Sequence, residues 1–193
     1  VGQQLSDMIL LPGTDWLVIT DEKKHELILV ERQSLEVIHR VAVSPYPVSV
    51  IVDRTGSWCY VTSLWSRRLS VIQLNRKEIA SSQVTQLFDM PFAPREQLLV
   101  RDDGTLIVAD SFAANLAILK TGLPSDGDVT LVGRQSFPGH NIRGLDVSVD
   151  GSMLLVAHQM LNELAHTVRN DVHWGLLMSN DLRWLKLDNI LEG

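Results

Sequence analysis

Residues 50–74 read VIVDRTGSWCYVTSLWSRRLSVIQL, and this stretch decides the fold. It contains an apolar run, a tight turn at Thr55-Gly56, a second apolar run at Trp58–Thr62, a polar loop and a third run at Leu69–Leu74. Each run is short, rich in Val, Ile, Tyr and Trp, and bounded by turn residues, as β-strands are. The stretch therefore predicts three antiparallel strands with short connections.

The same pattern recurs along the whole chain. A turn glycine lies between two apolar runs at Gly13, Gly56, Gly104 and Gly151, and the separations are 43, 48 and 47 residues. We expect four strands in each repeat, one before the glycine and three after it. Proline-bearing segments (SPYP, MPFAP and FPG) join the repeats, where a missing N–H donor does no harm to a sheet. The expected strands are 7–11, 16–20, 26–30 and 35–43 in the first repeat, 48–52, 58–62, 69–74 and 83–88 in the second, 97–100, 106–109, 115–119 and 129–137 in the third, and 144–149, 153–157, 174–178 and 182–187 in the fourth.

Four short strands repeated at this period are typical of the blades of a β-propeller. A lone four-stranded sheet of this composition leaves both faces apolar, and stacking the sheets around an axis buries them. A β-sandwich is the alternative, but the fixed period with a turn glycine in register favours the propeller. The predicted fold is all-β, with four four-stranded blades at residues 3–44, 45–90, 91–137 and 138–193.

Several segments also share a local sequence pattern. Tyr60-Val61-Thr62-Ser63 is followed by Leu69–Ile72, and Asp103–Asp110 and Arg143–Ala157 look like copies of the same repeat. These residues resemble the YVTN β-propeller repeat of bacterial and archaeal surface-layer and periplasmic proteins. The resemblance implies an extracytoplasmic location, in the periplasm or at the cell surface. Because propellers of this type usually close with about seven blades, we interpret the chain as part of a larger propeller rather than as a rare four-bladed ring.

Composition excludes several classes of protein. Hydrophobic residues make up 45% and charged residues 21% of the 193, which is typical of an ordered globular protein. The formal charge of −6 argues against a nucleic-acid partner. No run approaches the roughly 18 apolar residues of a membrane span. Cys59 is the single cysteine, so it forms no internal disulfide and is predicted to be a small buried residue. The chain begins at Val1 without a leader, which we interpret as a mature or excised piece.

The predicted topology brings four basic residues to one face. In a propeller, the link into the first strand and the loop between the second and third strands lie at one end, and the glycine turns lie at the other. We therefore expect Arg95, His140, Arg143 and His158 to gather near the central channel, where propeller pockets open. These four are the predicted ligand-binding residues, although a structural contact to a neighbouring blade is an equal alternative for Arg143. No catalytic residue is assigned.

The fourth repeat contains the largest irregularity. Between His158 and Trp174 it has the segment QMLNELAHTVRNDVH, whose apolar residues fall at helical spacing, so we expect a short amphipathic helix within 159–172 on the channel face. Long insertions in one repeat are often functional. His158, His166 and His173 are weak candidates for a metal site. They lack flanking cysteines and an HExxH spacing, so cap or surface positions fit them better and no metal is predicted.

The sequence favours a non-enzymatic binding or scaffold propeller that recognises a protein, glycan or small ligand on the channel face and needs no cofactor. The alternative is the propeller part of an enzyme, because propellers similar to this one include lactonases, and YVTN-like propellers are often joined to cytochrome c peroxidase domains. That resemblance would imply haem in a neighbouring domain outside this sequence. The open blade edges at the two ends of the repeat array also predict association with another chain.

Overall fold

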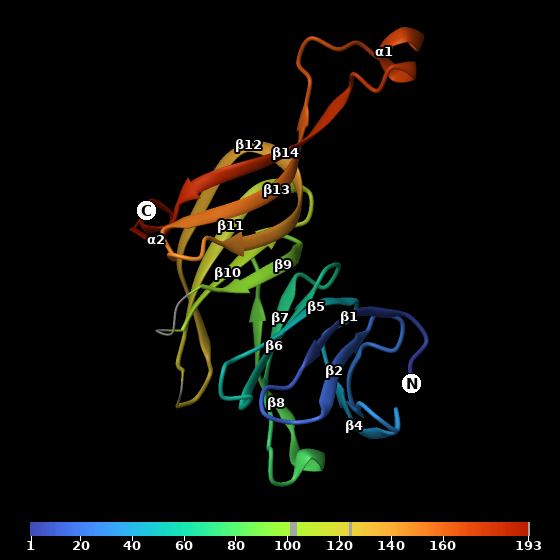
Figure 1. Cartoon of the computed structure of the whole chain (residues 1–193), viewed down its shortest axis with the longest axis vertical. Coiled ribbons are helices and arrows are strands. Elements are labelled where there is room, and N and C mark those ends of the chain that lie inside the picture. The colour runs from blue at the N-terminus through green and yellow to red at the C-terminus, as the bar shows by residue number, and fades with distance from the viewer. Residues whose placement is uncertain (101–103, 124, 193) are drawn as a thin grey trace.

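The strands lie in three antiparallel sheets, each built from consecutive segments of the chain (Figure 1). The computed structural model describes residues 1–100, 104–123 and 125–192. The first sheet has the order β1-β2-β3-β4, the second β5-β6-β7-β8, and the third β14-β13-β12-β11-β10-β9. The strands are β1 (Leu5–Leu10), β2 (Trp16–Asp21), β3 (Glu26–Glu31), β4 (Val37–Ala42), β5 (Pro47–Val52), β6 (Trp58–Ser63), β7 (Arg68–Gln73), β8 (Gln83–Asp89), β9 (Pro94–Leu99), β10 (Thr105–Asp110), β11 (Ala113–Thr121), β12 (Val129–Val147), β13 (Met153–Leu161) and β14 (Met178–Lys186), and the helices are η1 (Ile79–Ser81), α1 (Arg169–His173) and α2 (Leu187–Glu192).

An aspartate and a glycine hold the turn between the first two strands of the second repeat. In the second repeat, Gly56 has a φ of 70°, a conformation that costs glycine little. The carboxylate of Asp53 accepts hydrogen bonds from the backbone N–H groups of Ser57 at 2.8 Å and of Trp58 at 2.7 Å. These bonds fix the start of β6. In the third repeat Gly104 has a φ of 80°, and the three residues before it lie outside the described part of the chain.

Three apolar clusters lie between successive repeats, which is the arrangement predicted for stacked blades. Each cluster joins residues of one repeat to residues of the next, and the clusters are made almost entirely of strand residues. Cys59 is fully buried in the first of them, as predicted. The clusters include Val18, Leu27, Val61 and Ile72 between the first and second repeats, Tyr60, Leu69, Leu106 and Val108 between the second and third, and Ile107, Leu116, Leu154 and Val156 between the third and fourth.

The fourth repeat differs from the prediction. β12 is continuous from the last strand of the third repeat into the first strand of the fourth, because it pairs with β11 up to His140 and with β13 from His140 onwards. β13 and β14 form a long hairpin whose register runs from Met153–Lys186 to Leu161–Met178. The expected third strand at 174–178 is therefore wrong, and residues 182–186 belong to the third strand instead of a fourth. The helix α2 follows, and its Leu187 and Ile190 complete the third apolar cluster.

The helical insertion expected at 159–172 is also different. Gln159–Leu161 extend β13, and the helix α1 has five residues and buries none of them. The apolar residues at helical spacing have no surface to pack against at the tip of the β13–β14 hairpin, which projects away from the sheets (Figure 1). Short helices without such packing are marginal in water. Within the described residues, no helix is long and apolar enough to cross a bilayer.

Candidate channel-face site

The first strands of the repeats line up along one side of the sheets. β1 contacts β5, β5 contacts β9, and β9 contacts β12. A β-bulge lies close to the beginning of β1 at Ser6, of β5 at Val48 and of β9 at Arg95–Glu96, and β12 has one at Asn141–Arg143, just after its pairing changes from β11 to β13. Bulges redirect side chains and occur often beside functional sites. Two of the four bulges carry an arginine.

Charged side chains from three of these strands lie close enough to influence one another. The Nε atom of Arg95 lies 3.7 Å from the carboxylate of Glu96. Burial raises the pKa of Glu96, the nearby Asp7 raises it further, and Arg95 and Arg143 oppose these effects. Partial burial and the positive charge of Arg95 lower the pKa of Arg143, while Glu96 opposes them. The guanidinium groups of Arg95 and Arg143 are thus near enough for each charge to act on the other, with Glu96 opposing their repulsion.

Arg143 and His158, two of the four predicted ligand-binding residues, line the same cavity. The cavity has a volume of about 170 Å³ and lies between β12, β13 and β14. Its polar lining includes the amides of Asn141 and Asn180 and the carboxylate of Asp181. The Asp181 carboxylate accepts a hydrogen bond from the Ser179 hydroxyl at 2.8 Å. The cavity therefore presents one cation, one anion and several amide groups.

His158 is 3% exposed and is held by neighbours on both sides of its ring. The Nε of Arg183 donates to His158 Nε2 at 3.4 Å, so the ring proton lies on Nδ1, which is 3.2 Å from the carbonyl oxygen of Gln159. Phe137 packs edge-on against the ring, with the centroids 5.2 Å apart. Both nitrogens are thus used within the protein, and His158 shapes the cavity wall.

The position of His158 is buried and polar in the other repeats as well. Asp21, Ser63 and Asp110 end the corresponding second strands, and all three are buried. Burial alone would raise the pKa of Asp21, but hydrogen bonds from the backbone N–H groups of residues 3, 4, 23 and 24 lower it. Ser63 donates to the carbonyl oxygen of Ser44 at 2.8 Å. The equivalent residues Asp21, Ser63 and Asp110 have a structural role in the first three repeats. Burial alone therefore does not identify His158 as a functional residue.

The other predicted residues, Arg95, His140, His166 and His173, are not among those that line this cavity. His140 is exposed on β12 and pairs with Ala113 and Gln159, but it is not a lining residue. His166 is exposed in the β13–β14 hairpin, and His173 lies in α1 with its ring 5.3 Å from that of Trp174. In the described ranges, no three His, Cys, Asp or Glu side chains gather where a metal ion could be held. His158, His166 and His173 therefore do not form one such group.

Three residues of the site were not among the predicted ligand-binding residues. Glu96 and Asp7 follow no motif, and only the register of the first strands brings them together. Asn141 has a φ of 54°, which is uncommon for a residue other than glycine, and its side chain donates to Gln159 at 2.7 Å. In the sequence, only its position two residues before Arg143, in the segment Gly139–Arg143, could have indicated that Asn141 belongs to the site.

No protein-family model matches the sequence, and no curated protein sequence matches it either. Solved structures do match. Hydrazine synthase from Kuenenia stuttgartiensis is 18% identical with a TM-score of 0.60, and the match covers 97% of this chain and 65% of that one. The periplasmic gluconolactonase PpgL of Pseudomonas aeruginosa is 17% identical with a TM-score of 0.68, covering 95% and 57%. Dihydro-heme d1 dehydrogenase NirN is 13% identical with a TM-score of 0.65, covering 97% and 36%.

At these identities the likeness shows the fold, and the stacked sheets agree with it. The chain has the fold of part of a β-propeller. The predicted fold class is confirmed. The chain spans less than two thirds of the length of each of these solved chains. The bulged strands β1, β5, β9 and β12 are the first strands of the four repeats, and Asp7, Arg95, Glu96 and Arg143 lie on three of them.

Proposed function

We propose that this chain is part of a propeller that binds a small carboxylate-bearing ligand at its channel face, without catalysing a reaction. The observation that supports the proposal best is the pair of guanidinium groups, Arg95 and Arg143, on adjacent bulges. Glu96 offsets part of the repulsion between these two like charges, and a bound carboxylate would relieve more of it. The proposal requires no cofactor.

The cavity beside Arg143 supports a small ligand over a protein or a long glycan. Its volume of about 170 Å³ is below the range of about 300–1,000 Å³ typical of pockets for larger organic ligands. Asp181 and Asn180 could accept hydrogen bonds from hydroxyl or amino groups of a ligand whose carboxylate pairs with Arg143. A hydroxy acid has this combination of groups.

Two finer assignments belong to the same proposal. Tyr60–Ser63 and the later copies of that pattern support a repeat of the YVTN type. An extracytoplasmic location is supported by this resemblance and by the structural likeness to a periplasmic gluconolactonase. Both can be tested with the complete gene, by its encoded export signal and by its further repeats.

The binding proposal is tested by isothermal titration calorimetry with sodium gluconate, and with sorbitol as the uncharged comparison. We expect gluconate to bind and sorbitol not to bind. Arg143→Ala should weaken gluconate binding about tenfold or more, because a hydrogen bond to a charged group is lost. Arg169→Ala, an exposed arginine on α1, is the matched control and should bind as the unaltered protein does. Equal binding by Arg143→Ala and the control would contradict the proposal.

A lactonase-like hydrolase is the second candidate function. Burial raises the pKa of Glu96, and a carboxyl group whose pKa lies closer to neutrality is better suited to general acid–base catalysis. An assay of glucono-1,5-lactone hydrolysis, monitored by the acid that it releases, distinguishes the two functions. Turnover that is abolished by Glu96→Gln while gluconate binding is retained would favour the enzyme. Absence of turnover above the spontaneous rate would favour binding alone.

A further inference from the structure

A second polar cavity lies at the other end of the sheets, on the side of the glycine turns. It is a groove of about 820 Å³ between the β7–β8 connection, the β5–β6 turn and β4. The connection comprises residues 74–82, whereas the β3–β4 connection of the first repeat comprises only residues 32–36. The additional length contains the helix η1, whose Ile79 is buried in the first apolar cluster. The longer connection is therefore anchored to the core.

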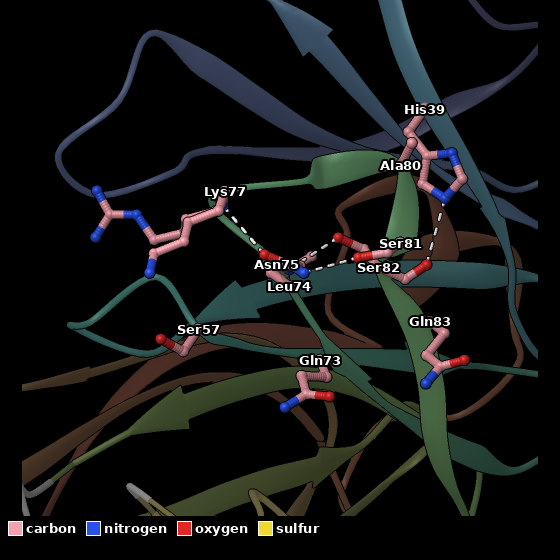
Figure 2. Close-up of a pocket in the computed structure, with 11 residues that line it drawn as sticks. His39, Ser57, Gln73, Leu74, Asn75, Lys77, Ala80, Ser81, Ser82 and Gln83 are labelled. Atoms are coloured by element: carbon pink, nitrogen blue, oxygen red, sulfur yellow. Dashed lines mark hydrogen bonds between the residues drawn. The ribbon is translucent and has the colours of Figure 1, made fainter.

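Side-chain hydrogen bonds hold this connection in one conformation. Asn75 Oδ1 accepts hydrogen bonds from the backbone N–H groups of Lys77 and Glu78, both at 3.1 Å. Asn75 Nδ2 donates to the Ser81 hydroxyl at 2.8 Å, and the backbone N–H of Asn75 donates to the Ser82 hydroxyl at 3.0 Å (Figure 2). The groove wall is thus formed before any ligand arrives, which lowers the entropic cost of binding.

Arg76 attaches the connection to two neighbouring turns. Its Nη1 donates to the carbonyl oxygen of Thr55 at 2.9 Å, and its Nη2 donates to that of Gly13 at 3.2 Å. Both acceptors are uncharged, so the positive charge of Arg76 has no carboxylate partner in these two bonds. The guanidinium also has more N–H donors than these two bonds use. The wall therefore retains a cation and spare donors.

The groove gathers polar groups that lack partners within the described residues. The Lys77 amine makes no observed hydrogen bond or ion pair with the described residues, and neither do the side-chain amides of Gln73 and Gln83. The two glutamines are directly paired across β7 and β8, so their side chains share one face of the sheet. Figure 2 shows them with Ser57 along one side of the groove, below the connection. None of the described residues that line the groove carries a carboxylate.

We propose that this groove binds a small hydroxylated anion, such as a sugar phosphate, at a site separate from the channel face. Lys77 and Arg76 provide the positive charge that pairs with the phosphate. The amides of Gln73 and Gln83 both donate and accept, which suits the hydroxyl groups of a sugar. The net charge of the whole chain is −6, so a groove with two cations and no carboxylate among its lining residues stands out from the molecule around it.

The test uses glucose 6-phosphate as the probe, with glucose and inorganic phosphate as comparisons, in titration calorimetry at low salt. Glucose 6-phosphate should bind saturably and more weakly as salt is raised. Lys77→Gln should weaken its binding about tenfold, because one charged contact is lost. Glucose should not bind, and inorganic phosphate should bind at least about tenfold more weakly than the sugar phosphate.

Two control variants separate this site from the channel face. Lys186→Gln changes an exposed lysine on β14, outside the groove, and Arg143→Ala changes the channel-face site. Both should bind glucose 6-phosphate as the unaltered protein does, and Lys77→Gln should bind gluconate at the channel face unchanged. The assignment would be overturned if glucose 6-phosphate failed to bind, or if Lys77→Gln bound it as tightly as the unaltered protein does. It would also be overturned if glucose or inorganic phosphate bound as tightly as glucose 6-phosphate.

Discussion

Glu96 lies among charged groups from three strands, and its protonation is coupled to folding. Burial raises its pKa above the ordinary value of 4.5. The folded state then binds the proton more tightly than the unfolded state between the ordinary and the raised pKa. Stability must therefore fall as the pH rises through this interval, because the ionised carboxylate is less favourable in the folded site.

The variant Glu96→Gln removes this titration. We expect the free energy of unfolding of the variant, relative to that of the unaltered protein, to increase as the pH rises from about 4 to neutrality. Urea unfolding at a series of pH values measures the difference. Glu163→Gln, at an exposed position in the β13–β14 hairpin, should leave the pH dependence unchanged. Parallel pH profiles for Glu96→Gln and the unaltered protein would contradict the expectation.

At the residue scale, the sequence predicted part of the candidate site. The repeat pattern was enough to place Arg143 and His158 on one side of the fourth repeat, and Arg95 near Arg143. It could not show that both nitrogens of His158 are engaged, because Arg183 reaches it from a strand that was assigned to another position. Nor could it identify Glu96, since burial and the approach of Asp7 from β1 depend on how the repeats stack.

At the scale of elements, alternation of apolar and polar residues decides where prediction succeeds. In the first three repeats, turns with Gly, Asp and Pro bound the short strands, so there is little freedom in where each strand begins and ends. The observed strands there match the expected ones closely. In the fourth, the spacing of Leu161, Leu164 and Val168 suits a helix, but nothing covers these side chains. The period-two pattern of Met178, Leu182 and Trp184 indicated the longer strand β14 that the structure contains.

The β13–β14 hairpin tip should be dispensable for folding. Replacing residues 162–177 with an Asn-Gly turn would join Leu161 directly to its partner Met178, as two-residue hairpins require. We expect the Tm to change by no more than about 2 °C, because α1 buries no side chain. Thermal unfolding followed by circular dichroism measures this. A loss of more than about 10 °C would show that the tip stabilises the sheets.

At the scale of the whole molecule, stability rests on the clusters between repeats. The second sheet lies between the first sheet and the third, and the tip of the β13–β14 hairpin projects from the third sheet (Figure 1). Each cluster therefore joins only neighbouring repeats. The period of the turn glycines was sufficient to predict this stacking, whereas the way the fourth repeat ends depends on α2, for which the sequence repeat has no counterpart.

Truncation in the central cluster tests this arrangement. Leu106 is fully buried between the second and third repeats, so Leu106→Ala should lower the free energy of unfolding by about 2–5 kcal/mol through lost burial and the remaining cavity. Leu164→Ala is the matched control, since Leu164 is 86% exposed, and its effect should stay within about 0.5 kcal/mol. Urea denaturation measures both. Similar values for the two variants would argue against an inter-repeat core at Leu106.

The continuous strand β12 limits how this protein can be rearranged. The segments after β4 and after β8 leave one sheet before they enter the next. A genetic crossover in these segments would exchange whole repeats without interrupting the hydrogen bonds between paired strands. The corresponding point near residue 137 lies inside β12, where the backbone is bonded first to β11 and then to β13. We therefore expect that the first and second repeats can each be duplicated, deleted or grafted singly. The third and fourth repeats share β12, so we expect them to be exchanged only together.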